Sequence, residues 1–164
     1  MMESDRVDQI LAQWRQERPD LDVSPMGIVG RITRLAKYLE HAIQATFSEF
    51  GLTVGEFDVL ATLRRSGQPY QLSPTELFNT LMVSSGTMTH RIDRLEQAEL
   101  VRRIPDRSDR RGTQIQLTEK GFNLIEKAVE AHVSNEQRIL NGLEASEREV
   151  LTQLLRKFLV SFEE

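Results

Sequence analysis

The 164-residue sequence contains no cysteine. This absence excludes disulfides, thiolate metal sites and cysteine nucleophiles, because each of them needs a thiol. The chain also lacks a run of about 18 apolar residues, the length that a membrane-spanning helix requires. The first ten residues, MMESDRVDQI, carry acidic side chains and no apolar stretch, so we expect no signal peptide. These absences together predict a cytoplasmic protein with no membrane association.

The sequence also lacks the common motifs of catalytic sites. The three histidines, His41, His90 and His132, lie far apart and show no metal-ligand spacing. The chain has no glycine-rich phosphate loop, no G-x-S-x-G and no H-E-x-x-H. An enzyme would need an active site assembled entirely by folding. We therefore expect a protein that is not an enzyme and that has no metal and no cofactor.

Positive charge is concentrated in one short segment. The net charge is −4, and both chain ends, residues 1–50 and 116–164, carry more acids than bases. Residues 102–111, RRIPDRSDRR, instead hold five arginines against two aspartates. A local excess of arginine between acidic flanks is typical of a phosphate-binding patch. On charge alone, a solvated loop explains this segment equally well.

The spacing of apolar residues predicts a mainly helical protein. Val7, Ile10, Leu11 and Trp14 form one apolar stripe on a short first helix. Ser24, as an N-cap before a proline, starts a long second helix that ends at Gly51. Further helices are predicted, from caps and apolar stripes, over residues 54–66, 74–80, 84–98, 119–140 and 146–162.

Two short apolar or alternating segments, 99–104 and 113–117, flank the arginine-rich turn and predict a β-hairpin. Two helices joined by a short turn and followed by a hairpin form a winged helix-turn-helix. The predicted fold is therefore mainly α with a small β-hairpin wing. We expect N-terminal helices for dimerisation and ligand binding over residues 1–50, the winged helix-turn-helix over 51–118, and C-terminal dimerisation helices over 119–164.

The segments GLTVGEFDVLATL and LSPTELFNTLMVSSGTMTHRIDRLEQAELVRRIPDRSDRRGTQIQLTEKG resemble the MarR family of bacterial transcriptional regulators. The most specific element is the wing, D-R-x-D-R-R followed by I-x-L-T-x-x-G. The resemblance implies a homodimer that binds double-stranded DNA at a pseudo-palindromic operator, acts as a repressor, and releases the operator when a small molecule binds. Oxidant sensing through a thiol, which occurs elsewhere in the family, is excluded by the lack of cysteine.

The helix over 84–98 is the expected recognition helix. Met88, Ile92 and Leu95 share one stripe, which must face the core. Hydroxyls and free N–H groups at a helix start suit phosphates and base edges in the major groove. The predicted DNA contacts of this helix are Ser85, Thr87, Thr89, His90 and Arg94. Simple capping of the helix is the alternative role for Ser85.

The wing is expected to supply arginine to the minor groove. Arg107 and Arg110 lie at its tip, where an arginine can enter a narrow groove. The resemblance implies that Asp109 and Arg111 hold the shape of the wing. Which of the two tip arginines reaches the groove is left open.

An arginine on the inward side of the recognition helix suggests a second site. Arg91 follows Met88 by three residues and therefore points toward the protein, where a buried guanidinium requires a carboxylate. Asp58, on a partly inward stripe, is the candidate partner. The pair is either a structural clamp or part of a ligand site, and Trp14 is either a packing anchor or a ligand contact.

The urate-responsive branch of the MarR family adds an N-terminal helix with a tryptophan. The resemblance implies a ligand site built from Trp14, Asp58, Arg91 and Arg103. In that scheme an anionic purine lies between Trp14 and Arg91, disturbs Asp58, and tilts the recognition helix through Arg103. An aromatic face with cations and one carboxylate suits a phenolic acid as well. Another alternative, a helical module that binds protein, is disfavoured by the basic wing.

Overall fold

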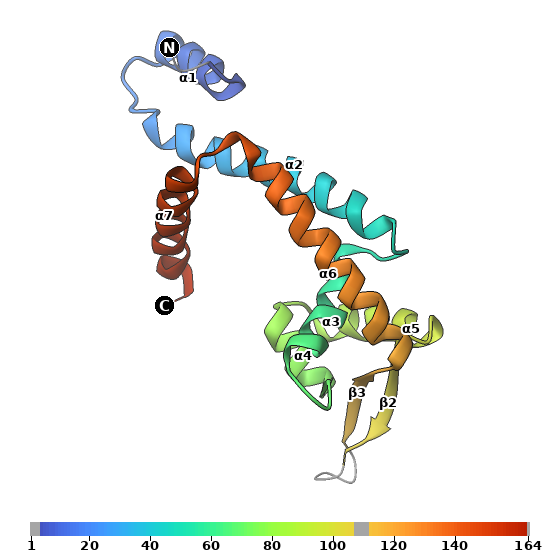
Figure 1. Ribbon diagram of the computed structural model, residues 1–164. Coiled ribbons are helices and arrows are strands. Elements are labelled where there is room, and N and C mark those ends of the chain that lie inside the picture. The colour runs from blue at the N-terminus through green and yellow to red at the C-terminus, as the bar shows by residue number, and fades with distance from the viewer. Residues whose placement is uncertain (1–3, 107–111, 164) are drawn as a thin grey trace. The chain divides into compact units, whose positions relative to one another are not determined.

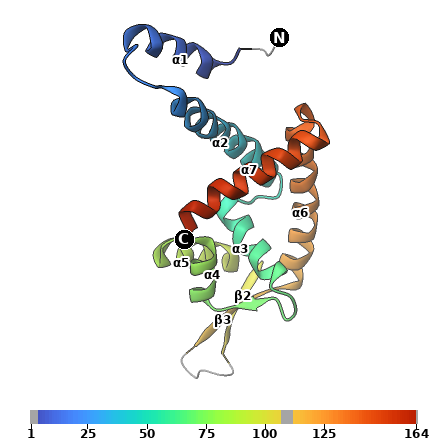
Figure 2. The ribbon, with the colours of Figure 1, turned by 90° about the vertical axis from the view of Figure 1, so that its left-hand side faces the viewer.

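The computed structural model describes residues 4–106 and 112–163. The chain divides into two compact units, residues 1–45 and 46–164. Unit 1 contains α1 (Arg6–Glu17) and most of α2 (Ser24–Ser48). Unit 2 contains the end of α2 and all later elements (Figures 1 and 2). Within the described residues, no helix is both long and apolar enough to cross a membrane.

In unit 1, a small apolar cluster and an ion-pair network join α1 to α2. Val7 and Leu11 of α1 are buried together with Val23. Arg31 of α2 pairs with Asp5 at 2.8 Å and with Asp8 at 2.7 Å. These two carboxylates also form the capping box that starts α1. The helix is thus fastened to α2 at its first turn.

Two details of unit 1 differ from the prediction. Ile10 and Trp14, on the predicted apolar stripe, are 37% and 41% exposed, because the buried stripe narrows to Val7 and Leu11. Ser24 is the first residue of α2 and not its N-cap. The oxygens of Asp22 accept hydrogen bonds from the backbone N–H and the hydroxyl of Ser24 instead.

Unit 2 holds a winged helix-turn-helix, which confirms the predicted fold class. Its elements are α3 (Val54–Arg65), β1 (Gln71–Leu72), α4 (Pro74–Leu81), α5 (Ser85–Gln97), β2 (Val101–Pro105), β3 (Thr113–Leu117), α6 (Glu119–Ile139), the 3-10 turn η1 (Leu140–Gly142) and α7 (Ala145–Glu163). The side chains that are fully or almost fully buried include Leu60, Leu63, Leu77, Met88, Ile92, Leu95, Ile115 and Ile125. They come from α3, α4, α5, β3 and α6, so one core holds the recognition helix in place.

The sheet has three antiparallel strands in the order β1-β3-β2, whereas the sequence predicted two. Val101 lies opposite Leu117, and Leu72 of β1 lies opposite Ile115. The prediction missed β1 because a strand of two residues carries no alternating pattern. β2 and β3 run side by side and project from the helices of unit 2 as the two sides of the wing (Figures 1 and 2).

A close backbone approach connects the wing to α6. A Cβ at Gly121, in the first turn of α6, would overlap the carbonyl oxygen of Leu100. The same carbonyl accepts a hydrogen bond from the backbone N–H of Thr118, the N-cap of α6, at 3.1 Å. Glycine at this position therefore lets α6 begin directly against the entry to β2.

Candidate nucleic-acid interface and effector site

The recognition helix α5 presents a polar face opposite its buried stripe. Met88, Ile92 and Leu95 are each 1% exposed, whereas Gly86, His90 and Gln97 on the other side are exposed. A helix with one face fixed in the core and the other open is suited to enter a groove of the duplex.

The first turn of α5 is organised by local hydrogen bonds. Ser84 is the N-cap, and its hydroxyl oxygen accepts a hydrogen bond from the backbone N–H of Thr87 at 3.2 Å. The hydroxyls of Ser84 and Thr87 lie 2.9 Å apart. The Thr89 hydroxyl donates to the carbonyl oxygen of Ser85 at 2.9 Å. All four residues remain exposed, so the hydroxyls are held in fixed positions at the open end of the helix.

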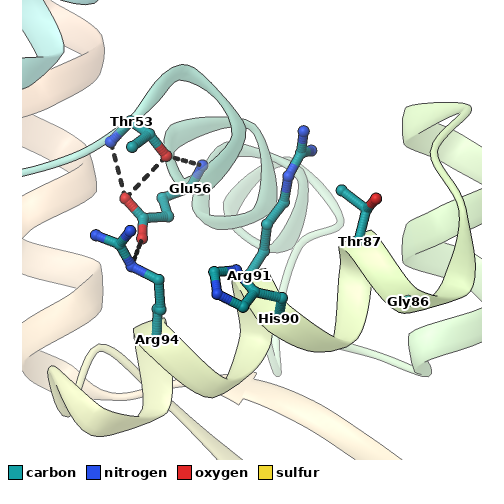
Figure 3. Close-up of a pocket in the computed structure, with 7 residues that line it drawn as sticks. All are labelled: Thr53, Glu56, Gly86, Thr87, His90, Arg91 and Arg94. Atoms are coloured by element: carbon teal, nitrogen blue, oxygen red, sulfur yellow. Dashed lines mark hydrogen bonds and ion pairs between the residues drawn. The ribbon is translucent and has the colours of Figure 1, made fainter.

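One flank of α5 is fastened to α3 by an ion pair. Nε of Arg94 lies 2.8 Å from Oε1 of Glu56 (Figure 3). The Glu56 side chain is only 6% exposed, whereas that of Arg94 is 53% exposed. Arg94, predicted from the sequence as a DNA contact, thus combines an anchored Nε with an accessible side chain.

The other flank is fastened to β2. Arg103 pairs with Asp93 at 2.5 Å and also with Glu96, both on α5. Its backbone N–H donates to Glu96 at 3.1 Å. The hydrogen bond to the Asp93 side chain is the largest of the interactions that raise the pKa of Arg103, so the guanidinium stays charged. Arg103, predicted as part of a ligand site, is therefore engaged by the recognition helix itself.

A hollow of about 500 Å³ lies between the start of α3 and α5. Three basic side chains, those of His90, Arg91 and Arg94, line it in Figure 3. Its remaining lining residues are Thr53, Glu56, Gly86 and Thr87. Cations and hydroxyls around an open hollow favour an anionic group, either a phosphate or a carboxylate.

Arg91 is half-buried against α3, as its inward position on α5 predicts. A Cβ at Gly55 would overlap its guanidinium, so glycine makes room for this side chain. Asp58 is half-buried as well. Burial raises the pKa of the Asp58 carboxyl, and the charges of Arg91 and Arg65 oppose this rise.

Among the described residues, Asp58 forms no ion pair with Arg91, which argues against the first of the two alternatives, a structural clamp. The two side chains interact through longer-range electrostatics. The carboxylate is therefore available to respond to a charge that enters beside Arg91.

The predicted ligand residues do not all belong to one compact unit. Trp14 belongs to unit 1, whereas Asp58, Arg91 and Arg103 belong to unit 2. Arg107 and Arg110 lie outside the described residues. Among the residues that the structure describes, no group of histidines and carboxylates is arranged to hold a metal ion.

Three residues that form the ion pairs of α5, namely Glu56, Asp93 and Glu96, were not predicted as site residues. Glu56 had a signal in the sequence, because Thr53-x-x-Glu56 has the spacing of a capping box before a helix. Its pairing with Arg94 had none, since it joins two helices that only the fold brings together.

The recognition helix α5, the ion pairs that hold its two flanks and the β-hairpin wing define a winged-helix DNA-binding protein. The model of the MarR family matches residues 52–113. The chain is 48% identical to the transcriptional regulator PecS of Dickeya dadantii, over 91% of this chain and 90% of PecS. The chain belongs to the MarR family. It is a DNA-binding regulator of transcription, and the family is not one of enzymes.

Solved structures agree with this assignment. A mutant form of Escherichia coli MarR in complex with operator DNA matches with a TM-score of 0.72 and 26% identity, over 95% of this chain and 99% of MarR. Bordetella bronchiseptica BpsR, whose DNA binding is regulated by 6-hydroxynicotinic acid, matches with a TM-score of 0.68 and 30% identity. That match covers 79% of this chain and 91% of BpsR.

Proposed function

We propose that this chain is a repressor that binds a pseudo-palindromic operator as a homodimer and releases it when a small anionic aromatic molecule binds. The observation that carries the proposal is the fastening of α5 on both flanks by ion pairs, which leaves its polar face open. Two recognition helices would enter successive major grooves, with half-sites about one helical turn apart. The wing arginines would reach the minor groove.

Salt-dependent duplex binding tests the DNA part of the proposal. The probe is a duplex from the DNA directly upstream of this protein's gene, titrated at several salt concentrations. Its affinity should fall steeply with salt, because phosphate neutralisation releases counterions. Binding that does not depend on salt would contradict the proposal and favour a module that binds protein.

Helix α7 supports the homodimer. Along Ala145–Glu163 no residue is buried, although the helix carries an apolar stripe. The exposed members of that stripe are Leu151, Leu154, Leu155, Phe158, Leu159 and Phe162. A second copy of the chain, which carries the same stripe, would cover this face, and a continuous apolar stripe is typical of a helix that packs on a partner.

Light scattering of the purified chain tests the homodimer. The wild-type protein should have twice the mass of one chain at micromolar concentration. Leu155→Asp should dissociate it, because the substitution places a charge in the apolar stripe, whereas Gln153→Asp on the exposed polar side of α7 should not. A wild-type monomer would refute the proposed operator geometry.

Arg91 and Asp58 support the effector part. A half-buried guanidinium beside a carboxyl without an ion pair suits a flat, weakly acidic molecule. Urate or a related purine is the leading candidate, with Trp14 as its stacking partner and Arg103 as the link to α5. The similarity to BpsR favours a second candidate, an aromatic acid of the phenolic or pyridine type.

Trp14 is the only tryptophan, so its fluorescence reports one location in each chain. Urate should quench this emission saturably and weaken duplex binding over the same concentration range. Arg91→Ala should abolish both effects, because it removes the cation that holds the anion. Asp58→Ala should alter them. If urate and xanthine leave the emission unchanged, Trp14 is a packing residue and not a ligand contact, and an aromatic acid is favoured as the effector.

A further inference from the structure

Glu56 is a buried carboxylate whose two oxygens have different partners. Oε2 accepts hydrogen bonds from the backbone N–H of Thr53 at 2.8 Å and from the Thr53 hydroxyl at 2.9 Å. Oε1 lies 2.8 Å from Nε of Arg94 (Figure 3). One side chain therefore caps α3 and holds an arginine of the recognition helix.

The capping role alone does not explain a buried charge. The next capping box, Ser73 with Glu76, has the same hydrogen bonds at 2.7 Å and 2.7 Å. Glu76 is exposed, and within the described residues it forms no ion pair. Glutamine serves a capping box as well as glutamate does. A buried carboxylate destabilises the fold unless it is paired, so the charge of Glu56 matters through Arg94.

Arg94 gains a fixed orientation from this pairing. Its side chain is 53% exposed and lines the hollow together with His90 and Arg91. An unanchored arginine loses conformational freedom when it binds a phosphate, and this loss weakens the contact. With Nε held at Glu56, part of that freedom is already lost before DNA arrives.

We propose that Glu56 is a positioning residue for DNA binding, which holds Arg94 through Nε so that its exposed part contacts a DNA phosphate. The proposal rests on the proposed function, because it requires Arg94 to lie on the DNA-facing side. It adds an acidic residue, itself unable to attract DNA, to the determinants of affinity.

The test is a double-mutant cycle of Glu56→Gln and Arg94→Ala, with Glu76→Gln as the matched control. Each variant is titrated with the fluorescent upstream duplex at several salt concentrations, and its thermal unfolding is recorded. Glu56→Gln should weaken binding about 3- to 10-fold in the wild-type background and by less than about 2-fold in the Arg94→Ala background. Arg94→Ala should lower the salt slope by about one. Glu76→Gln should leave affinity unchanged.

Three outcomes would overturn the inference. Equal losses from Glu56→Gln in both backgrounds would mean that Glu56 acts only through the stability of the fold. Tighter binding by Glu56→Gln would mean that the carboxylate competes with phosphate. Equal binding by the wild-type protein and Arg94→Ala would remove the contact that Glu56 is inferred to position. A wild-type protein that binds no duplex would instead refute the proposed function itself.

Discussion

Gly55→Ala is a substitution that should move one side chain and little else. The added Cβ would overlap the guanidinium of Arg91, which is the far end of a flexible side chain and can give way. Gly55 lies in the first turn of α3, and its φ is not in the left-handed region. The substitution should therefore displace Arg91 without straining the backbone.

Two opposing effects determine how much Gly55→Ala changes the free energy of unfolding. Alanine is favoured over glycine inside a helix by about 0.5–1 kcal/mol. Moving the Arg91 side chain away from its preferred rotamer costs about 0.5–1.5 kcal/mol. The effects nearly cancel, so the free energy of unfolding should change by less than about 1 kcal/mol and the Tm by less than about 4 °C. The effector response should be lost, because the cation no longer lies beside Asp58.

The assay pairs thermal unfolding with duplex binding in the presence and absence of urate or an aromatic acid. Gly142→Ala is the control, since its Cβ would have no atom within 4 Å. A fall in Tm of more than about 8 °C would show that Arg91 cannot move aside, which refutes the structural argument. An unchanged effector midpoint, with Arg91 displaced, would refute the role of Arg91 in effector binding.

Further substitutions test the glycine at the start of α6, the ion pairs of Arg103, the Asp58 carboxyl and the wing arginines. Gly121→Ala should lower the free energy of unfolding in urea by about 1–3 kcal/mol, because its Cβ would overlap the backbone of Leu100, which can shift only if the fold is distorted. An unchanged urea midpoint would contradict this prediction. Arg103→Ala should lower stability by only about 1 kcal/mol, since its ion pairs are partly exposed, yet weaken duplex binding about 10-fold by freeing one flank of α5; unchanged affinity would show that this clamp does not set the position of α5. Asp58→Asn should raise the Tm at pH 7. Burial raises the pKa of Asp58 above its ordinary 3.8, so the ionised carboxylate destabilises the fold as the pH rises, and the difference between the variants should vanish below that pH. Arg110→Ala should weaken duplex binding by about 1–3 kcal/mol without loss of folding. If only Arg107→Ala weakened binding, Arg107 would be the arginine that enters the minor groove.

The helices were predictable because their signals are local. Thr53, Ser73, Ser84 and Thr118 are residue types that favour an N-cap, and each of them caps the helix that it precedes. Ser24 failed as a cap because Asp22, two residues earlier, accepts its hydrogen bonds. β1 is too short to show a period, and its pairing with β3 depends on residues about 45 positions away.

The sequence allowed several residues of the candidate site to be predicted, but not which residues contact one another there. The buried stripe of α5 indicated that His90 and Arg94 face outward and that Arg91 points toward the protein, and the helical period alone was enough for this. The ion pairs that hold α5 were not predictable, because Glu56, the partner of Arg94, lies on α3, and Arg103, the partner of Asp93 and Glu96, lies on β2. The resemblance to the urate-responsive branch implied Arg103 as part of the ligand site, whereas its ion pairs join it to the recognition helix. Ion pairs between elements depend on side-chain reach, which periodicity does not report.

In the proposed mechanism, the ion pairs that hold the two flanks of α5 determine how an effector would move this helix. Arg91 lies on the same flank of the helix as Arg94, beside α3, whereas Arg103 holds the opposite flank. An anion that neutralises Arg91 changes the electrostatics of the α3 flank first, where Glu56 and Asp58 supply the nearby carboxylates. The pairs of Arg103 with Asp93 and Glu96 would persist, because they are already satisfied. The helix would then tilt about its β2 flank, so Arg94 would lose its phosphate before the wing leaves the duplex.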